Sequence, residues 1–245
     1  MFMVDNAVRA VVCFRKVLRC MDFQFVWLNL SKIFERRMKI VCISDTHSLH
    51  HHMTIPNGDL LIHAGDVSSR GRLEEIEMFN DWMGSLPHRH KVVIAGNHDF
   101  FFEKFPKEAK RLITNADYLN DSGILIEGIR IWGSPVQPWF YDWAFNRKRG
   151  KDIRKHWDLI PTNTDILITH GPPFGILDTT DNGEKAGCEN LLDIVQNRVR
   201  PQLHVFGHIH EAYGQQQIGE TLFVNASMVD LAYRPVREAI VINYP

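Results

Sequence analysis

Five short apolar runs along the chain each end in a group of polar residues, and this repeated pairing constrains the fold more than any other feature. The runs cover residues 39–44, 60–64, 92–95, 166–169 and 203–206. Because they are short and rich in Val, Ile and Leu, they predict buried strands. Polar residues just beyond the carboxyl ends of strands form ligand sites in α/β proteins. The sequence therefore predicts an α/β fold with one site at that edge.

The remaining periodicity fills in this layout. Apolar residues recur at three- and four-residue steps over 73–86, which predicts a helix with one face packed on a sheet. Segment 187–198 shows the same pattern, with Leu191, Leu192 and Val195 as its expected buried stripe. Two apolar runs, 124–127 and 129–133, flank Gly128 and predict a hairpin. Three more strands are expected at residues 213–218, 222–225 and 239–243.

The polar groups that follow the five runs are rich in side chains that bind metals. They are Ser44-Asp45-Thr46-His47, Gly65-Asp66, Gly96-Asn97-His98-Asp99, Thr169-His170-Gly171 and Gly207-His208-Ile209-His210. Carboxylate, imidazole and carboxamide groups without thiolate suit Mn²⁺, Fe²⁺ or Zn²⁺. Asp45 and His47 are two residues apart, so an extended strand would place both on one face, and His208 and His210 repeat this spacing. Asp66 follows a strand end, where it could bridge two ions roughly 3.5–4 Å apart.

In this order the five motifs resemble those of the calcineurin-like metallophosphoesterase superfamily, whose pattern is D-x-H, GD, GNH, a lone His before Gly, and GHxH. The resemblance runs from about residue 39 to the C-terminus. Flanking segments at 79–87, 133–140 and 205–208 are similar to the branch called metallophosphoesterase-domain-containing proteins. The resemblance implies a four-layer sandwich of two mixed β-sheets flanked by helices. It also implies phosphodiesterase activity on small substrates, including cyclic nucleotides, with weak or variable turnover.

Carried over residue by residue, the resemblance implies two divalent metal ions, expected to be Mn²⁺ with Fe or Zn as alternatives. The first ion would be bound by Asp45, His47 and His210. The second would be bound by Asn97, His170 and His208, and Asp66 would bridge the two. Some animal members of the branch replace the residue at the position of His208. Because this chain keeps it, we expect an active enzyme.

The resemblance also implies the chemistry. Hydroxide formed from metal-bound water would attack phosphorus in line, while the cations and Asn97 offset the developing charge. His98 matches the superfamily's histidine that binds no metal and protonates the leaving-group oxygen. Imidazole suits this step, because an ordinary pKa of about 6.5 lets it donate a proton near neutral pH.

The stretch after Gly65-Asp66 departs from one subgroup. Protein serine/threonine phosphatases carry there an aspartate that orients the catalytic histidine, followed by an arginine that grips phosphate. This chain has Ser69 and Arg70 at those positions. The orienting carboxylate is therefore expected to be missing, which argues against phosphoprotein phosphatase chemistry. Arg70 is a candidate phosphate contact, with an ordinary exposed loop arginine as the alternative.

The other histidines have plainer explanations. His63, inside an apolar run, is either a satisfied strand residue or a support for the metal centre. The tract 50–52 is expected on a solvated loop. Asp99 is expected to shape the loop after Asn97 rather than to act in catalysis. No role is assigned to four further histidines, His88, His90, His156 and His204.

An aromatic segment, 138–145, precedes the basic residues 147–149. Rings beside cations could stack a nucleobase and hold a phosphate, with a packed loop or a subunit contact as the alternative. Trp139 and Trp143 are the candidates for stacking. Prolines 172–173 would fix a loop at the rim of the site, and the polar stretch 178–185 would form an adjacent mobile lip.

Composition fits one main globular domain. The chain has 245 residues, of which 44% are hydrophobic and 23% charged, and can bury a substantial core. A net charge of −1 gives no general attraction to a polyanion, so a small phosphoester or nucleotide is expected as partner rather than a polynucleotide. The four cysteines lack CxxC spacing, which favours a reduced, cytoplasmic location. The oligomeric state stays open.

Residues 1–37 differ from the domain expected over 38–245. They combine an excess of basic residues with many apolar ones. They contain neither a run of roughly 18 apolar residues that could span a bilayer nor a signal-peptide cleavage site. Three explanations are open: an amphipathic surface or partner-binding helix, an organelle-targeting extension, or residues upstream of the natural start. Met38 directly precedes the first strand and is a candidate initiator.

The sequence thus favours a dimetal phosphodiesterase acting on small phosphodiesters, with cyclic nucleotides first. A phosphomonoesterase or phosphoprotein phosphatase is the alternative within the same class. A nucleotide-binding regulatory protein with slow turnover is the alternative from another class.

Overall fold

The computed structural model describes residues 37–245, of which Lys39–Ile242 form one compact unit. The expectations about residues 1–36 lie outside the described residues, and Met38 as the natural start stays a prediction. Within the described range, no helix combines the length and hydrophobicity needed to cross a bilayer.

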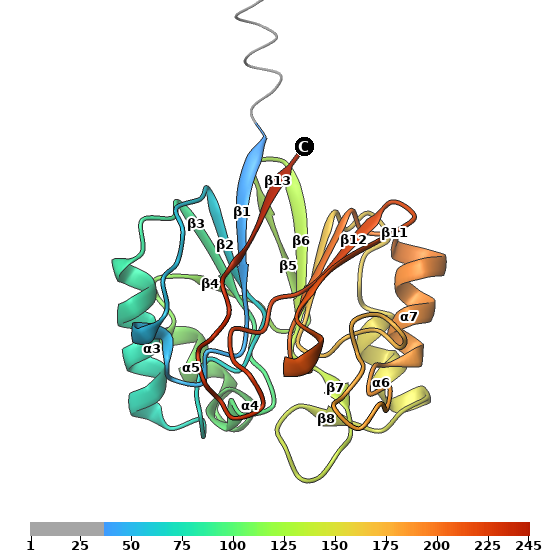
Figure 1. Cartoon of the computed structure of the whole chain (residues 1–245), viewed down its shortest axis with the longest axis horizontal. Coiled ribbons are helices and arrows are strands. Elements are labelled where there is room, and N and C mark those ends of the chain that lie inside the picture. The colour runs from blue at the N-terminus through green and yellow to red at the C-terminus, as the bar shows by residue number, and fades with distance from the viewer. Residues whose placement is uncertain (1–36) are drawn as a thin grey trace, which may run out of the picture. The chain divides into compact units, whose positions relative to one another are not determined.

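Two β-sheets lie side by side in the fold (Figure 1). The first sheet, in the order β13-β1-β2-β3-β4, contains β1 (Met38–Ile43), β2 (Leu60–His63), β3 (His90–Val93), β4 (Asp117–Tyr118) and β13 (Ile240–Tyr244). The second sheet, in the order β11-β12-β10-β9-β6-β5, contains β5 (Ser122–Ile126), β6 (Ile129–Ser134), β9 (Ile166–Thr169), β10 (Leu203–Phe206), β11 (Gly214–Ile218) and β12 (Thr221–Asn225). The strands predicted from the apolar runs are confirmed.

Helices cover the outer face of each sheet (Figure 1). The helices beside the first sheet are α3 (Leu73–Ser85), α4 (Phe100–Lys104) and α5 (Pro106–Leu112). Those beside the second are α6 (Lys151–Trp157) and α7 (Glu189–Ile194). The predicted four-layer α/β sandwich is therefore confirmed.

The helix predicted over 73–86 is α3, and its apolar stripe explains its position. Ile76, Phe79 and Met83 are fully buried and pack in one core cluster with Val41 and Leu61 of the first sheet. Burying each such side chain stabilises the fold by roughly 1.5–3 kcal/mol. The amphipathic period therefore attaches the helix to the sheet through one face.

The second predicted helix is shorter than expected. Segment 187–198 forms α7 only up to Ile194, and a π-helical turn, Val195–Val199, follows it. Arg200 then ends the turn in a left-handed conformation with φ of 50°. Leu191 and Val195 of the expected stripe are buried in the core cluster of the second sheet, whereas Leu192 is only partly buried and Ile194 is buried in its place. The stripe was therefore predicted in part, and the helix type changes.

The predicted hairpin is confirmed. β5 and β6 pair in antiparallel register with Ile126 opposite Ile129. The two residues between them, Glu127 and Gly128, have φ of 49° and 89°. Positive φ at both central positions is what a two-residue turn between twisted strands requires.

Elements of only two residues were not predicted, because hydrophobic periodicity needs a longer window. One is β4. The others are β7 (Gln137–Pro138) and β8 (Asn146–Arg147), which form a small sheet of their own at the ends of the aromatic segment.

Candidate metal centre

The five polar motifs lie in loops that follow the carboxyl ends of strands from both sheets. β1, β2 and β3 of the first sheet lead into the segments with Asp45, Asp66 and Asn97. β9 and β10 of the second sheet lead into those with His170 and the His208–His210 pair. Metal-binding atoms of Asp45 and His210 lie close together, and so do those of Asp66 and His170. The motifs of the two sheets therefore meet at one edge, as predicted.

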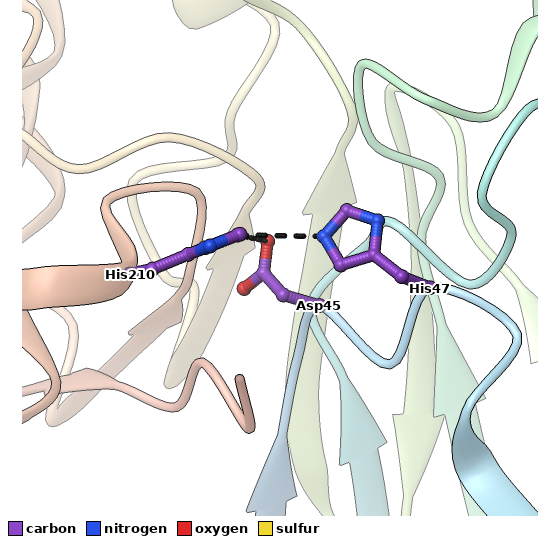
Figure 2. Close-up of side chains that lie close together, drawn as sticks. All are labelled: Asp45, His47 and His210. Carbon is purple, nitrogen blue, oxygen red and sulfur yellow. Dashed lines mark hydrogen bonds and ion pairs between the residues drawn. The ribbon is translucent and has the colours of Figure 1, made fainter. Parts of the chain in front are cut away.

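Asp45, His47 and His210 form a compact group of metal-binding atoms (Figure 2). The Nε2 atoms of His47 and His210 lie 3.4 Å apart. Nε2 of His210 is also 3.5 Å from Oδ1 of Asp45. All three residues are buried. Two imidazole nitrogens and a carboxylate oxygen thus point at one small volume.

The strand geometry predicted for this convergence was wrong in one respect. β1 ends at Ile43, and Asp45 and His47 lie beyond it in left-handed conformations with φ of 55° and 43°. His208 also has a positive φ, 70°, and His210 begins a short 3-10 turn. Neither pair is therefore part of an extended strand, and the loops rather than the strand pleat aim the side chains.

Left-handed backbone is common among the motif residues. Asp66, like Asp45, His47 and His208, has a positive φ, in its case 54°. For residues other than glycine this conformation is strained and tends to occur where surrounding structure enforces it at functional sites. The packed loops therefore hold these four side chains in orientations that the free chain would avoid.

Asp66 lies between two sets of metal-binding atoms. Its Oδ2 is 3.8 Å from Nε2 of His47 and 3.4 Å from Nε2 of His170. Nε2 of His170 is in turn 2.8 Å from Oδ1 of Asn97. Asp45, Asp66 and His170 also form a group able to hold a metal ion. This placement fits the bridging position predicted for Asp66.

His208 is placed differently from the other predicted ligands. Its backbone N–H donates to the carboxylate of Asp45, 3.1 Å from both oxygens. Its ring centroid lies 5.0 Å from that of His170 and 5.2 Å from that of Phe140. Its side chain belongs to none of the three His/Asp groups that the described residues form. Its role as a ligand stays a prediction.

Backbone carbonyls orient two of the histidines. Nδ1 of His170 donates to Ala64 O at 3.0 Å, and Nδ1 of His210 donates to Asp230 O at 3.3 Å. Because a carbonyl can only accept, each ring carries a proton on Nδ1 and turns Nε2 toward the carboxylates. This is the usual outer contact of a metal-binding histidine.

Opposite charges balance within the buried centre. Burial by itself would raise the pKa of Asp45 and of Asp66, but His210 and His170 respectively hold these values below their usual range. Burial would lower the pKa of His170, yet the Asp66 carboxylate outweighs it and raises the value to about 9. Burial dominates at His47 and lowers its pKa to about 4. The carboxylates thus stay charged and attract cations.

His98 has an orienting partner that the sequence did not predict. Its Nδ1 donates to the backbone carbonyl of Ser69 at 2.8 Å. Its backbone N–H donates to Asp66 Oδ1 at 2.8 Å, and its ring stacks on Trp143 with centroids 4.3 Å apart. Ser69 stands where the phosphatase subgroup has its orienting carboxylate, and here a main-chain oxygen takes that place.

Two motif glycines leave room for carboxylates. A Cβ at Gly207 would overlap the carboxylate of Asp45, and a Cβ at Gly96 would overlap that of Asp66. Neither glycine has a positive φ, so the requirement is space rather than backbone freedom. The glycines of the GNH and GHxH motifs therefore permit the close approach of loops from different strands.

A cavity of about 750 Å³ opens beside the centre. His47, His98, Arg70 and Trp143 line it, which places the candidate phosphate contact and one candidate stacking residue at the site. Trp139 is 58% exposed and does not line this cavity.

Tyr233 is a site residue that sequence reasoning missed. Its ring centroid lies 4.8 Å from His47, 5.5 Å from His210 and 6.0 Å from His98. The residue has a left-handed φ of 57° in a loop that Asp230 closes by accepting hydrogen bonds from Arg234. No motif precedes it, and only the tertiary fold brings it over the three histidines.

The neighbouring polar residues largely behave as predicted. Asp99 accepts hydrogen bonds from the backbone of Gly96, Val67 and Ser68 and so ties two motif loops together. Burial, with the nearby Asp66 charge, raises the pKa of Asp99 to about 6. His63 bonds to Thr46 Oγ1 at 3.0 Å and accepts from the backbone N–H of Gly65.

The histidine tract was predicted less well. His51 and His52 are exposed, but His50 is fully buried, with its ring against Phe79 and Trp82. Its imidazole serves as a core side chain there. A run of identical residues cannot reveal which one turns inward.

Backbone bridges and hydrogen bonds hold the loop and the lip that were expected after His170. Pro173 pairs with Cys188, and Thr179 pairs with Lys185. The buried carboxylate of Asp178 accepts hydrogen bonds from the backbone of Gly175 and Gly187. Thr180 lines a second cavity of about 250 Å³, and Asp66, Asn97 and His208 line it as well.

The family model for calcineurin-like phosphoesterases matches residues 38–212, which contain all five motifs. The chain belongs to this family. A curated member at 47% identity over 231 residues is the human metallophosphoesterase domain-containing protein 1, with 84% of this chain and 71% of that protein covered. A more distant match, 27% identical over 171 residues, is the "Probable glycerophosphodiester phosphodiesterase GpdQ" of Arcobacter nitrofigilis, covering 66% of this chain and 60% of that one.

Solved structures agree on the fold. TT1561 of Thermus thermophilus superposes with a TM-score of 0.52 at 11% identity, covering 84% of this chain and 99% of that one. Calcineurin-like phosphoesterases are phosphoester hydrolases with a dinuclear metal site. The residues present here fit such a site, because converging Nε2 and carboxylate atoms belong to buried side chains, and two of the histidines are anchored through their opposite ring nitrogens.

Proposed function

We propose that this chain is a dimetal phosphodiesterase that hydrolyses small phosphodiesters, with cyclic nucleotides as the first candidates. The observation that carries the proposal is the convergence of buried Asp and His donors from both sheets around Oδ2 of Asp66. The name of the Arcobacter relative supports a diester over a monoester. Nitrogen and oxygen donors without thiolate support Mn²⁺, with Fe or Zn as alternatives.

The proposed ligands divide into two sets. Asp45, His47 and His210 would hold one ion. Asn97, His170 and His208 would hold the other, with Asp66 shared between them. Two divalent ions bound in this way supply Lewis acidity and lower the pKa of a coordinated water.

His98 would protonate the oxygen that leaves phosphorus. Because its Nδ1–H is held by Ser69 O, the proton that can be given away sits on Nε2. His98 also forms a group with His47 and Asp66 in which the ligand atoms lie within 4.8 Å of one another. This closeness supports His98 as the proton donor, because an alkoxide leaving group would form beside the proposed metal ligands.

The remaining contacts would bind substrate. Arg70 lines the large cavity and would meet phosphate oxygens, as would the amide of Asn97. The rings of Trp143 and Phe140 are inclined by only 25° with centroids 6.5 Å apart, and both line the smaller cavity. A nucleobase there would have two aromatic surfaces to contact, which supports a nucleotide substrate.

The test is hydrolysis by protein stripped with chelator and refilled with Mn²⁺. Substrates would be 2′,3′-cyclic and 3′,5′-cyclic nucleotides, bis-nitrophenyl phosphate and nitrophenyl phosphate, each with an Asp66→Asn control. Diester turnover that requires metal and vanishes in the control is expected. Faster turnover of the monoester would favour a phosphomonoesterase. Tight 5′-nucleotide binding with negligible turnover would favour a regulatory protein.

A further inference from the structure

The hydrogen bond that orients His98 depends on a main-chain atom in a surface loop. Ser69 O accepts from Nδ1 of His98 at 2.8 Å, and this oxygen lies between Ser68 and Arg70 in the segment that joins β2 to α3. A main-chain acceptor can hold a side chain in place only when its own loop is held in place. The contacts that hold residues 68–72 therefore decide how well His98 is aimed.

One carboxylate, that of Glu75, gathers this loop. Its Oε1 accepts from Ser69 N at 3.0 Å and from Ser48 Oγ at 2.9 Å. Its Oε2 accepts from Arg70 N at 3.2 Å and from Arg72 N at 2.9 Å. Both peptide groups that meet at Ser69 are therefore restricted in their motion, one through Ser69 N and the other through Arg70 N.

The opposite side of the loop is tied to the metal centre. Ser69 Oγ donates to His47 O at 2.6 Å, and Ser69 N also contacts Ser48 Oγ at 3.2 Å. Ser48 follows His47 directly in the chain. Glu75 thus connects the loop whose carbonyl orients His98 with the loop of a proposed metal ligand.

Capping of α3 explains only part of this arrangement. Arg72 is the N-cap residue and Glu75 is at N3, so the contact with Arg72 N is the helix-capping one. The contacts with Ser48, Ser69 and Arg70 involve donors outside the helix. A carboxylate that served the helix end alone would not need them.

We propose that Glu75 is a positioning residue that holds the Ser69 carbonyl against Nδ1 of His98, so that Nε2 of His98 faces the leaving group. The inference rests on the proposed function, because it assumes that His98 acts as the proton donor. In this chain a glutamate acting through the backbone would do the work of the aspartate that Ser69 replaces.

The experiment compares Glu75→Gln with Glu74→Gln on two diesters. Glu74 is an exposed neighbour in the same helical turn, so its variant makes the same charge change without touching the loop. The first substrate, bis-nitrophenyl phosphate, has a leaving group that needs little protonation. The second, a 2′,3′-cyclic nucleotide, has a poor leaving group that needs a proton.

A positioning role predicts a selective loss. Since general acids contribute roughly 10²–10⁴-fold, we expect Glu75→Gln to lower kcat for the cyclic nucleotide at least about tenfold and for the nitrophenyl diester by less than about threefold. Bound metal and the activity of the Glu74→Gln control should be unchanged. Any change in KM of Glu75→Gln should be the same for both diesters, because Arg70, the candidate phosphate contact, lies in the same loop. The double variant with His98→Gln should lose no more than His98→Gln alone, because both changes remove one function.

Three results would overturn the inference. Equal losses on both substrates would mean a structural role. An intact Glu75→Gln beside an inactive His98→Gln would reject Glu75 while leaving the proposed function in place. A fully active His98→Gln would show that His98 is not the proton donor, and it would therefore also reject the positioning role of Glu75 while leaving the diesterase in place. If Glu75→Gln fails to fold, Ser48→Ala serves instead, because it removes one of the four contacts of Glu75. It must then lower kcat for the cyclic nucleotide more than for the nitrophenyl diester, by a smaller factor than expected for Glu75→Gln.

Discussion

The two sheets contribute unequally to the candidate metal centre. Loops of the first sheet carry both carboxylates, Asp45 and Asp66. One metal-binding group, formed by His47, Asp66 and His98, comes from these loops alone. The second sheet contributes histidines alone. His170 and His210 complete groups only with carboxylates from the first sheet.

This difference shows how the halves are held together at the site. Buried carboxylates are unfavourable unless they are paired, and imidazole groups from the opposite sheet pair them here. The raised pKa of His170 and the lowered pKa values of Asp45 and Asp66 are two sides of that pairing. The first sheet therefore supplies negative charge, and the second sheet supplies imidazole groups that neutralise it.

The largest effect should come from removing a carboxylate of the first sheet. Asp45 belongs to two of the three groups, so Asp45→Asn is expected to lower diesterase activity at least about 10³-fold and to remove bound metal. His208→Ala should cost less, because His208 belongs to none of these groups and is proposed to bind the second ion only. Metal content by mass spectrometry and kcat/KM check this. Equal losses would show that the halves contribute alike.

A smaller effect should follow from crowding the point where the halves meet. Gly207→Ala inserts a methyl group from the second sheet into the carboxylate of Asp45, while Gly171→Ala meets only ordinary contacts at 3.7 Å or more. Overpacking of this kind costs about 1–3 kcal/mol. We expect lower thermal stability and weaker metal binding for Gly207→Ala only. A harmless Gly207→Ala would mean that the loops can separate freely.

The aromatic segment belongs to neither large sheet and should act on substrate rather than on metal. Base stacking contributes about 1–3 kcal/mol, so Trp143→Ala should raise KM for a cyclic nucleotide roughly 5- to 150-fold and leave bis-nitrophenyl phosphate less affected. Trp139→Ala, an exposed neighbour, is the control. Equal changes for both substrates would argue against stacking.

Acid stability offers the mildest comparison. Both halves bury histidines that are not among the predicted ligands, among them His50 and His63 in the first half and His204 in the second. Burial lowers the pKa of His50 to about 4 and that of His204 to about 3. Both values lie below the ordinary value of about 6.5, so the unfolded chain binds more protons below that pH. The free energy of unfolding should thus fall by up to about 1.4 kcal/mol per pH unit for each residue as the pH drops below about 6.5.

His50→Phe tests the first half alone. Neither ring nitrogen of His50 has a hydrogen-bond partner among the described residues, so phenylalanine should be tolerated at pH 7. Thermal unfolding followed between pH 7 and pH 4 should show a shallower decline for the variant. An unchanged slope would assign the acid sensitivity elsewhere.

The strands and the helix α3 could be predicted because burial imposes a period on local sequence. Ile76, Phe79 and Met83 face the sheet at helical spacing, and the β5–β6 turn follows from Glu127-Gly128. The motif residues were predictable because each follows a strand. Their geometry was not, since φ of Asp45 and His47 is set by loops packed against other loops.

The sequence alone determined which residue types meet at the carboxyl edge of an α/β sandwich, because apolar runs specify strands and strand ends specify loops. Only the tertiary structure decided how those residues are aimed. The Ser69 carbonyl that orients His98, the Glu75 carboxylate that gathers its loop, and the ring of Tyr233 over three histidines were all brought into place by folding. Such contacts depend on how two independently patterned sheets and their loops pack, and no local pattern records that packing.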